Sequence, residues 1–199
     1  MTRQAPPPSP RRAELLEASY RYTLEHGLAD ISLRPLAAAV GSSPRVLILL
    51  FGSKDGLVRA LLARAREDEM GILGRLGAAG DGADARGLTD AAGHVWDWLA
   101  DPAHRPLLRL WAESYARSLV ATEGADGPWH GFARATVEDW LGVLAGHQPP
   151  AERGSAGGLA RRTAVLALLR GALLDLLATG DDARVTAAVR SQLAASPAA

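Results

Sequence analysis

The sequence contains no cysteine, which excludes disulfide bonds, thiolate metal sites and thiol nucleophiles. Aromatic residues make up only 5% of its 199 residues, and no stretch alternates β-branched or aromatic residues with polar ones for long. This lack of strand patterns predicts an all-α fold. The most apolar segment, residues 164–177, is interrupted by Arg170 and Asp175, whereas a membrane-spanning helix needs roughly 20 apolar residues. We therefore expect a soluble protein of the reducing cytoplasm.

An excess of either charge is also lacking, because 22 Lys and Arg residues balance 22 Asp and Glu residues. A net charge of zero by itself argues against a nucleic-acid-binding protein. The charges are unevenly distributed, however: residues 1–66 hold 10 basic and 5 acidic side chains (+5), and the remainder holds 12 and 17 (−5). This asymmetry indicates an anionic partner for the N-terminal part. Residues 1–10 are Pro-rich and are predicted to form a flexible arm.

Residues 31–57 contain two short helical patterns joined by a turn. The residues of this turn are Gly41, Ser42, Ser43 and Pro44. The glycine suits the left-handed conformation that ends a helix, either serine can cap the next helix, and the proline fits its first position. Ser32 is a good N-cap for the first helix of the pair. A helix, a tight turn and a second helix are a common means of placing a helix in the DNA major groove.

Apolar spacing and helix-ending residues predict about nine helices in all. Besides the pair in residues 31–57, they cover about residues 11–26, 53–76, 89–100, 104–121, 129–145, 159–178 and 182–195. Glycine-rich segments at residues 77–87, 123–128 and 148–158 are predicted to be loops.

The helix of residues 11–26, the helix-turn-helix and the long helix from Ser53 together resemble the N-terminal domain of TetR-family transcriptional regulators. The matching residues are Leu15, Leu16, Ala18, Gly27, Ser32, Leu33, Arg34, Ala37, Gly41, Ser43, Leu47, Phe51, Ser53, Lys54 and Leu57. The resemblance implies a TetR-like fold with a helix-turn-helix DNA-binding domain in residues 11–57. It also implies a helical ligand-binding and dimerisation domain in residues 58–199.

The resemblance further implies a homodimeric regulator, expected to be a repressor, that binds a palindromic operator in double-stranded DNA and responds to a small hydrophobic effector. The DNA-contacting residues it suggests are Arg11, Arg12, Ser32, Arg34, Ser42, Ser43, Pro44, Arg45, Val46, Leu49 and Lys54. Among them Arg45 would contact bases, and Ser43 and Lys54 would hold phosphates. The sequence departs from the family at residues 48–50, where Ile-Leu-Leu stands in place of the usual Tyr and His.

All five tryptophans lie between residues 96 and 140. In the resembled family this middle portion contains the effector pocket, and small-molecule sites are commonly apolar cavities between helices. The predicted pocket residues are Trp96, Trp111, Tyr115, Trp129 and Trp140. Trp96 and Trp98 are not expected to face inward together, because they are two residues apart on one helix.

The helix predicted over residues 159–178 is apolar on two faces, which implies burial on more than one side. The burial could lie in the core of a single chain, but the resemblance favours a dimer through the last two helices. The predicted interface residues are Leu166, Leu169, Leu173, Leu177, Val185 and Val189.

No metal-binding, Walker-type, dinucleotide-binding or nucleophile-elbow motif is present, and the histidines lack metal-ligand spacing. We expect no catalytic residue, no metal and no cofactor. Glu67, Asp68 and Glu69 are contiguous on a helix and are expected to form a solvated face. Two other classes stay open: a TetR-like ligand-binding or protein-interaction module whose DNA binding has weakened, and an α-helical enzyme. A gel shift at two salt concentrations would separate the regulator from the module, and turnover of a bound aromatic ligand would indicate the enzyme.

Overall fold

The computed structural model describes residues 9–28, 31–78, 87–121 and 127–195, which form ten α-helices, a short 3-10 helix and no strand. The all-α prediction is confirmed for this part of the chain. The helices are α1 (Pro10–His26), α2 (Leu33–Ala39), α3 (Pro44–Phe51), α4 (Lys54–Ala78), α5 (Leu88–Ala100), η1 (Pro102–His104), α6 (Arg105–Val120), α7 (Phe132–Gly146), α8 (Pro150–Arg153), α9 (Ala156–Thr179) and α10 (Asp182–Ala195).

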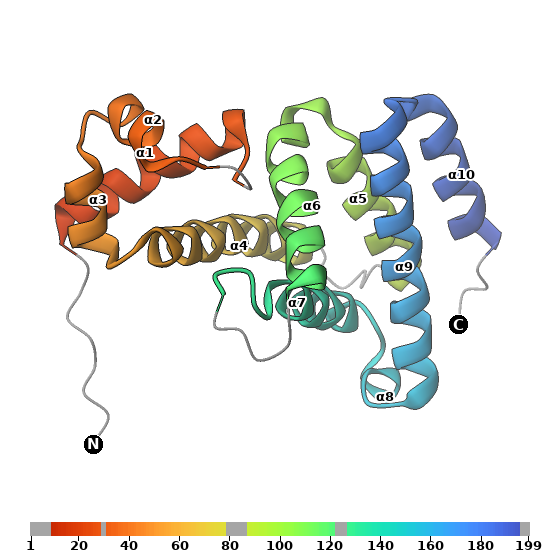
Figure 1. The fold of residues 1–199 in the computed structure, drawn as a ribbon. Helices are drawn as coiled ribbons and strands as arrows, with labels where there is room; N and C mark the ends of the chain where they lie inside the picture. Colours follow the sequence, from red (N-terminus) through yellow and green to blue (C-terminus); the bar gives the residue numbers. More distant parts are fainter. Residues whose placement is uncertain (1–8, 29–30, 79–86, 122–126, 196–199) are drawn as a thin grey trace, which may run out of the picture.

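The first three helices pack together as a unit that we call the head, residues 10–51 (Figure 1). Serine side chains cap two of them. The Ser9 hydroxyl accepts a hydrogen bond from Arg12 N, and the Ser43 hydroxyl accepts one from Val46 N, each at 3.3 Å. The buried core of the head contains Leu15, Tyr20, Leu28, Leu36, Leu47 and Phe51.

Helix α4 extends from the head to helices α5–α10, which we call the body (Figure 1). It contacts α1 and α3 in the head and α5, α6 and α7 in the body. Polar contacts fix it to both parts. The Tyr20 hydroxyl of α1 donates to Asp68 Oδ2 at 3.0 Å, and Arg66 Nη2 donates to Asp139 Oδ1 of α7 at 2.8 Å. A displacement of α4 would therefore change contacts with both the head and the body.

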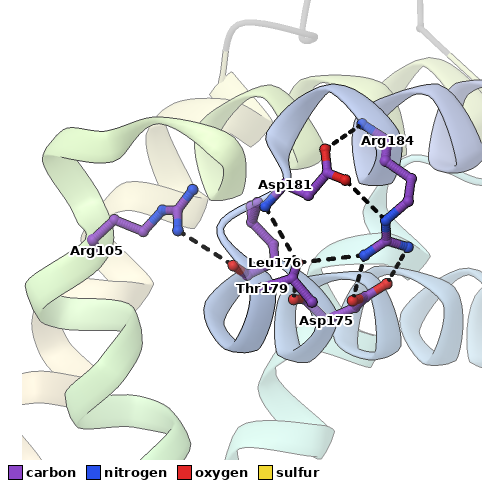
Figure 2. A network of polar contacts seen from close by, with 6 residues as sticks. All are labelled: Arg105, Asp175, Leu176, Thr179, Asp181 and Arg184. Atoms are coloured by element: carbon purple, nitrogen blue, oxygen red, sulfur yellow. Dashed lines mark hydrogen bonds and ion pairs between the residues drawn. The ribbon is translucent and has the colours of Figure 1, made fainter.

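Helices α9 and α10 lie side by side at the edge of the body, and an arginine network fixes the corner between them (Figures 1 and 2). Arg184 Nη1 and Nη2 donate to the two carboxylate oxygens of Asp175 at 2.8 and 2.7 Å, and Arg184 Nε donates to Asp181 at 3.2 Å. These hydrogen bonds from Arg184 lower the pKa of the Asp175 carboxyl. Arg105 Nη1 of α6 reaches Leu176 O at 3.5 Å, so the corner is also tied to α6.

The predicted bounds of most helices differ from the observed ones by a few residues, and residues 182–195 coincide with α10. One predicted loop, residues 148–158, is wrong because it contains α8 and the start of α9. Ser155 caps α9 by accepting from Gly158 N at 2.9 Å. The predicted flexible arm and the loops at residues 77–87 and 123–128 lie largely outside the described residues.

Among the described residues, no single helix is long and apolar enough to cross a membrane. The bent pair of α2 and α3 meets the criteria of length and apolar composition only when the two helices are counted together.

Candidate DNA-binding surface and apolar cavity

Helices α2 and α3 form a helix-turn-helix whose two axes are bent by 99°, as is typical of DNA-binding pairs. Gly41 has a φ of 62° in the turn, a conformation that costs glycine little and other residues more. The turn is closed by a hydrogen bond from Ser42 N to Ala37 O at 2.8 Å. The sequence prediction placed this turn at the same residues.

Most of the predicted DNA-contacting side chains are exposed, on the pair and on the helices next to it. Those that are exposed are Arg11, Ser32, Arg34, Ser43, Arg45, Leu49 and Lys54, whereas Pro44 and Val46 are half-buried. Arg11 Nη1 donates to Glu14 Oε2 at 2.8 Å, so the Glu14 carboxylate partly neutralises the charge of Arg11. Lys54 begins α4, where Ser53 Oγ accepts from Gly56 N at 2.9 Å. Helix starts at Pro44 and Lys54 thus bring free backbone N–H groups close to exposed cations, an arrangement that suits phosphate.

Two of the predicted DNA-contacting residues face the interior. Arg12 Nε donates to Leu50 O at 3.3 Å, and the Arg12 guanidinium lies 4.9 Å from the centre of the Phe51 ring. Arg12 is half-buried and joins α1 to the end of α3, so it has a structural role beside its predicted contact with DNA. The Ser42 hydroxyl oxygen is buried without a hydrogen-bond partner.

The apolar run of α3 divides between core and surface. Leu47 is fully buried, Phe51 is nearly so, and Leu50 packs against the core while half-exposed. Leu49 is the exception, because 80% of its surface is exposed. The recognition helix thus presents Arg45 and a leucine where polar base-contacting side chains are common.

An apolar cavity of about 30 Å³ lies in the body between α4, α5, α6, α7 and α9. The residues that line it are Ala65, Glu69, Trp98, Leu99, Leu107, Leu108, Leu110, Trp111, Ser114, Phe132, Trp140, Leu166, Leu169, Arg170 and Leu173. The lining is predominantly hydrocarbon and aromatic, with Glu69 and Arg170 as its charged members. Within the described ranges, no three His, Asp or Glu side chains are arranged to hold a metal ion.

Glu69 was expected on a solvated face, but the structure places it in the cavity wall. Trp140 Nε1 donates to Glu69 Oε1 at 2.5 Å. Burial raises the pKa of the Glu69 carboxyl to about 7. The Trp140 hydrogen bond and the charges of Arg170 and Arg66 oppose that rise, and nearby Asp139 adds to it. The neutral form of this carboxyl is therefore populated near neutral pH.

Arg170 lies on α9, where aromatic rings cover its guanidinium. The guanidinium carbon is 5.1 Å from the centre of the Tyr115 ring and 5.7 Å from that of Trp111, and Nη1 donates to the Tyr115 hydroxyl at 3.3 Å. Burial lowers the pKa of Arg170. Its Nε and Nη2 atoms are buried without a hydrogen-bond partner, and so is Trp111 Nε1.

The predicted pocket residues are only partly brought together. Trp111 and Trp140 line the cavity. Tyr115 is not part of the lining, but its ring centre lies 5.0 Å from that of Trp111. Trp96 is wrong as a pocket residue, because it is buried on the opposite side of α5 and its Nε1 donates to Thr186 of α10 at 3.1 Å. Trp129 is half-buried outside the lining.

Sequence reasoning missed part of the lining. Trp98, which shares α5 with Trp96, does line the cavity. Both can face the interior because α5 is packed between α10 and the cavity. The two charged residues Glu69 and Arg170 were also missed; the only local sign was the interruption of an apolar helix by Arg170.

One wall of the cavity is mechanically joined to the head. Helix α6 contributes Leu107, Leu108, Leu110, Trp111 and Ser114 to the lining. On the same helix, Glu113 Oε2 accepts a hydrogen bond from Leu28 N at 3.0 Å, just after the end of α1. A Cβ atom added at Gly27 would lie 3.3 Å from the same Glu113 oxygen, so the approach is close.

Most of the predicted dimer-interface residues lie in the core of the single chain. Leu166, Leu169, Leu173, Val185 and Val189 are buried there, and Leu177 is half-buried. Within the single chain, α9 packs against α5, α6, α7 and α10, and these contacts account for the burial of the first five residues. Many exposed residues of α9 and α10 are small, namely Ala160, Ala164, Ala167, Gly171, Ala178, Ala183, Ala187, Ala188, Ser191 and Ala194, and the large apolar side chains of Leu159 and Leu174 are exposed on α9.

Comparison with known proteins finds no matching family model and no matching curated protein. Solved structures do match over nearly the whole chain. The multidrug binding protein EbrR complexed with imidazole has a TM-score of 0.64 at 23% identity and covers 96% of this chain and 93% of its own. A TetR transcription regulator from Haloarcula marismortui has 0.67 at 16% identity, covering 94% and 95%. A TetR transcriptional regulator from Legionella pneumophila has 0.68 at 15% identity, covering 94% and 96%. The chain has the fold of TetR-family transcriptional regulators.

Proposed function

We propose that this chain is a cytoplasmic DNA-binding transcriptional regulator, a repressor whose operator affinity changes when a small effector binds the body. Residues 11–57 serve as the DNA-binding domain, and residues 58–199 bind the effector and dimerise. The observation that carries the proposal is the helix-turn-helix with exposed Arg34 on its first helix, Arg45 on its second helix and Lys54 at the start of the helix that follows. The TetR fold around it supports the same assignment.

The exposed residues divide into two kinds of DNA contact. Backbone N–H groups at the starts of α3 and α4, together with Ser43 and Lys54, suit phosphate, which supplies most of the sequence-independent affinity. Arg45 is the residue of α3 best suited to hydrogen-bond a base edge, and exposed Leu49 can contact a thymine methyl group. We therefore expect salt-sensitive binding with modest sequence preference.

The cavity supports the effector part of the proposal. It is apolar and enclosed by five helices, and two of them, α4 and α6, also contact the head. Its volume of about 30 Å³ suits one or two water molecules, so an organic ligand must push the walls apart. Movement of α4 and α6 would then shift the head. EbrR, which has the same fold, is also complexed with the aromatic compounds proflavin and ethidium.

A second copy of the chain is the partner that fits the outward face of α9 and α10. Small side chains let two helices approach closely, and Leu174, 52% exposed, supplies an apolar anchor. Leu174→Arg is expected to yield a folded monomer in sedimentation, whereas Leu173→Arg buries a charge in the core and should prevent folding. A monomeric wild-type protein would contradict the dimer.

DNA binding is tested by fluorescence anisotropy with a library of short duplexes at about 50 mM and about 200 mM salt, a range over which electrostatic binding weakens strongly. We expect tight binding at the lower concentration and a steep loss at the higher one. Absence of binding at the lower concentration would overturn the regulator. It would favour a TetR-like interaction module, for which the exposed Leu49 of α3 would be a contact residue.

A further inference from the structure

The cavity contains more hydrogen-bond donors than acceptors. Arg170 Nε, Arg170 Nη2 and Trp111 Nε1 are buried without a partner, and both residues line the cavity. Ser114 and Trp140 already donate, to Leu110 O at 2.7 Å and to Glu69 at 2.5 Å. Leaving a buried donor unpaired is costly, more so when it is charged. These unpaired donors therefore favour a ligand that carries hydrogen-bond acceptor atoms.

The charge in the wall also favours an acceptor. Arg170 is held in place by the faces of Tyr115 and Trp111, a cation–π arrangement that leaves its Nε and Nη2 edge without a partner. The only carboxylate of the lining, Glu69, already accepts from Trp140, and its burial favours the neutral form. No ion pair is formed between Glu69 and Arg170, so the positive charge is not cancelled by direct contact.

The rest of the wall determines what the ligand must carry beside its acceptor. Apart from these polar groups, the lining consists of leucines and of the rings of Trp98, Trp111, Phe132 and Trp140, which contact hydrocarbon or an aromatic ring favourably. The small volume favours a compact body over a long chain. An ammonium group would meet Arg170 at close range and would leave the three donors unpaired.

We propose that the cavity binds a compact apolar carboxylic acid, whose carboxylate accepts hydrogen bonds from Arg170 Nε, Arg170 Nη2 and Trp111 Nε1. A carboxylate matches the edge of a guanidinium with two parallel charge-assisted hydrogen bonds. The apolar body lies against Trp98, Phe132 and the leucines of α6 and α9. The role of the acid as an effector rests on the proposed function. Binding of the acid to the cavity does not require that the chain binds DNA.

The test compares three probes with the same seven-carbon skeleton: benzoate, benzamide and benzylammonium. Their affinities for the full chain are measured by calorimetry at constant pH and salt. Benzoate is expected to bind at least about tenfold more tightly than either other probe, an effect of one charge-assisted hydrogen bond or more. Equal affinities, tightest binding of benzylammonium, or no binding of benzoate to the folded chain would each overturn the inference.

Variants locate the binding groups. Arg170→Met is expected to weaken benzoate at least about tenfold and benzamide by less than about threefold, because only the ion loses a charged partner. Arg190→Met is the matched control: it removes an exposed α10 arginine that donates to Asp97 at 3.3 Å, and benzoate affinity should not change. Trp111→Phe keeps a ring but removes one donor, and should weaken benzoate even if Arg170→Met fails to fold. Unchanged benzoate affinity in both cavity variants would refute the assignment.

DNA binding separates the two proposals. Benzoate affinity that depends on Arg170, in a chain that binds no DNA, would uphold the ligand class and remove the regulator. A chain that binds DNA but no benzoate would uphold the regulator and remove the ligand class.

Discussion

The head and the body place their functional polar groups in opposite surroundings. In the head and at the adjoining start of α4, the predicted DNA-contacting cations Arg34, Arg45 and Lys54 are exposed, and the buried side-chain atoms of the head without partners belong to the hydroxyls of Ser19 and Ser42. In the described part of the body, the buried atoms without partners are the guanidinium nitrogens of Arg105, Arg162 and Arg170 and the indole nitrogen of Trp111.

This difference suits the two partners that we propose for the chain, DNA and a small apolar ligand. A DNA duplex is large and charged, and it is met by side chains that stay hydrated until contact. A small apolar ligand must leave water, so its polar recognition requires donors that are already buried. We therefore expect DNA binding by the exposed cations to depend on salt, and ligand binding in the cavity to depend on buried polar groups. Four experiments compare exposed and buried side chains in the two regions.

The largest effect is expected from the core of the head. Leu47→Ala should lower the free energy of unfolding by about 2–5 kcal/mol, since Leu47 is fully buried. Leu49→Ala, two residues away on the same helix and 80% exposed, should change it by less than about 0.5 kcal/mol. Urea unfolding measures both. Similar losses in the two variants would mean that Leu49 is covered in solution, for example by a second chain.

The stability of the chain should depend on pH through Glu69, which α4 places in the wall of the cavity. Its pKa rises from the usual 4.5 to about 7 on folding, so between these values the folded chain keeps a proton that the unfolded chain releases. Stability from this group therefore falls as pH rises through that window, and the penalty is complete above it.

Glu69→Gln removes that titration while keeping an acceptor for Trp140. We expect it to stabilise the chain at pH 8 relative to wild type, on the order of 1–3 kcal/mol, and to lose this advantage near pH 4. Glu67→Gln is the control, since Glu67 is exposed on the same helix. Parallel pH profiles for wild type and Glu69→Gln would show that the carboxyl is solvated.

The two proposed types of DNA contact should be separable by substitutions on α3 and at the start of α4. Arg45→Ala is expected to cost on the order of 1–3 kcal/mol of binding and to relax preference at one base position. Lys54→Ala should weaken all sequences alike and reduce the salt slope by about one. Anisotropy titrations over several salt concentrations measure both. A sequence-dependent loss in the Lys54 variant would reverse the assigned roles.

The smallest effect is expected at the α9–α10 corner. Arg184→Met removes the exposed ion pairs with Asp175 and Asp181, and such pairs contribute little because water and salt screen them. We expect a small decrease in melting temperature that disappears at high salt. A large decrease that persists at high salt would show that the corner determines the packing of α9 against α10.

Local patterns were sufficient for most of the helices and insufficient for the cavity. Ser43, Pro44 and Gly41 specify the turn through backbone chemistry that depends on neighbouring residues alone. Helix α8 was missed because a single turn within a Pro/Gly-rich stretch has no apolar period. The two apolar faces of α9 correctly indicated burial on both sides, but not that the same chain covers both.

The charged residues of the cavity could not be foreseen from their neighbours. Glu69 stands in a run with Glu67 and Asp68 that resembles any solvated helix face. Its burial depends on Trp140, which lies 71 residues further along the chain. A long-range contact of this kind has no signature within a helical turn.

The hydrogen bond from Leu28 N to Glu113 gives the junction of head and body a reporter of its own. This amide follows the end of α1, and its acceptor lies on α6. Its exchange with deuterated water therefore measures how often the two units separate at this point, independently of helix unfolding. If an effector that enters the cavity draws α6 away, the Leu28 amide should exchange faster while the amides inside α1 keep their protection.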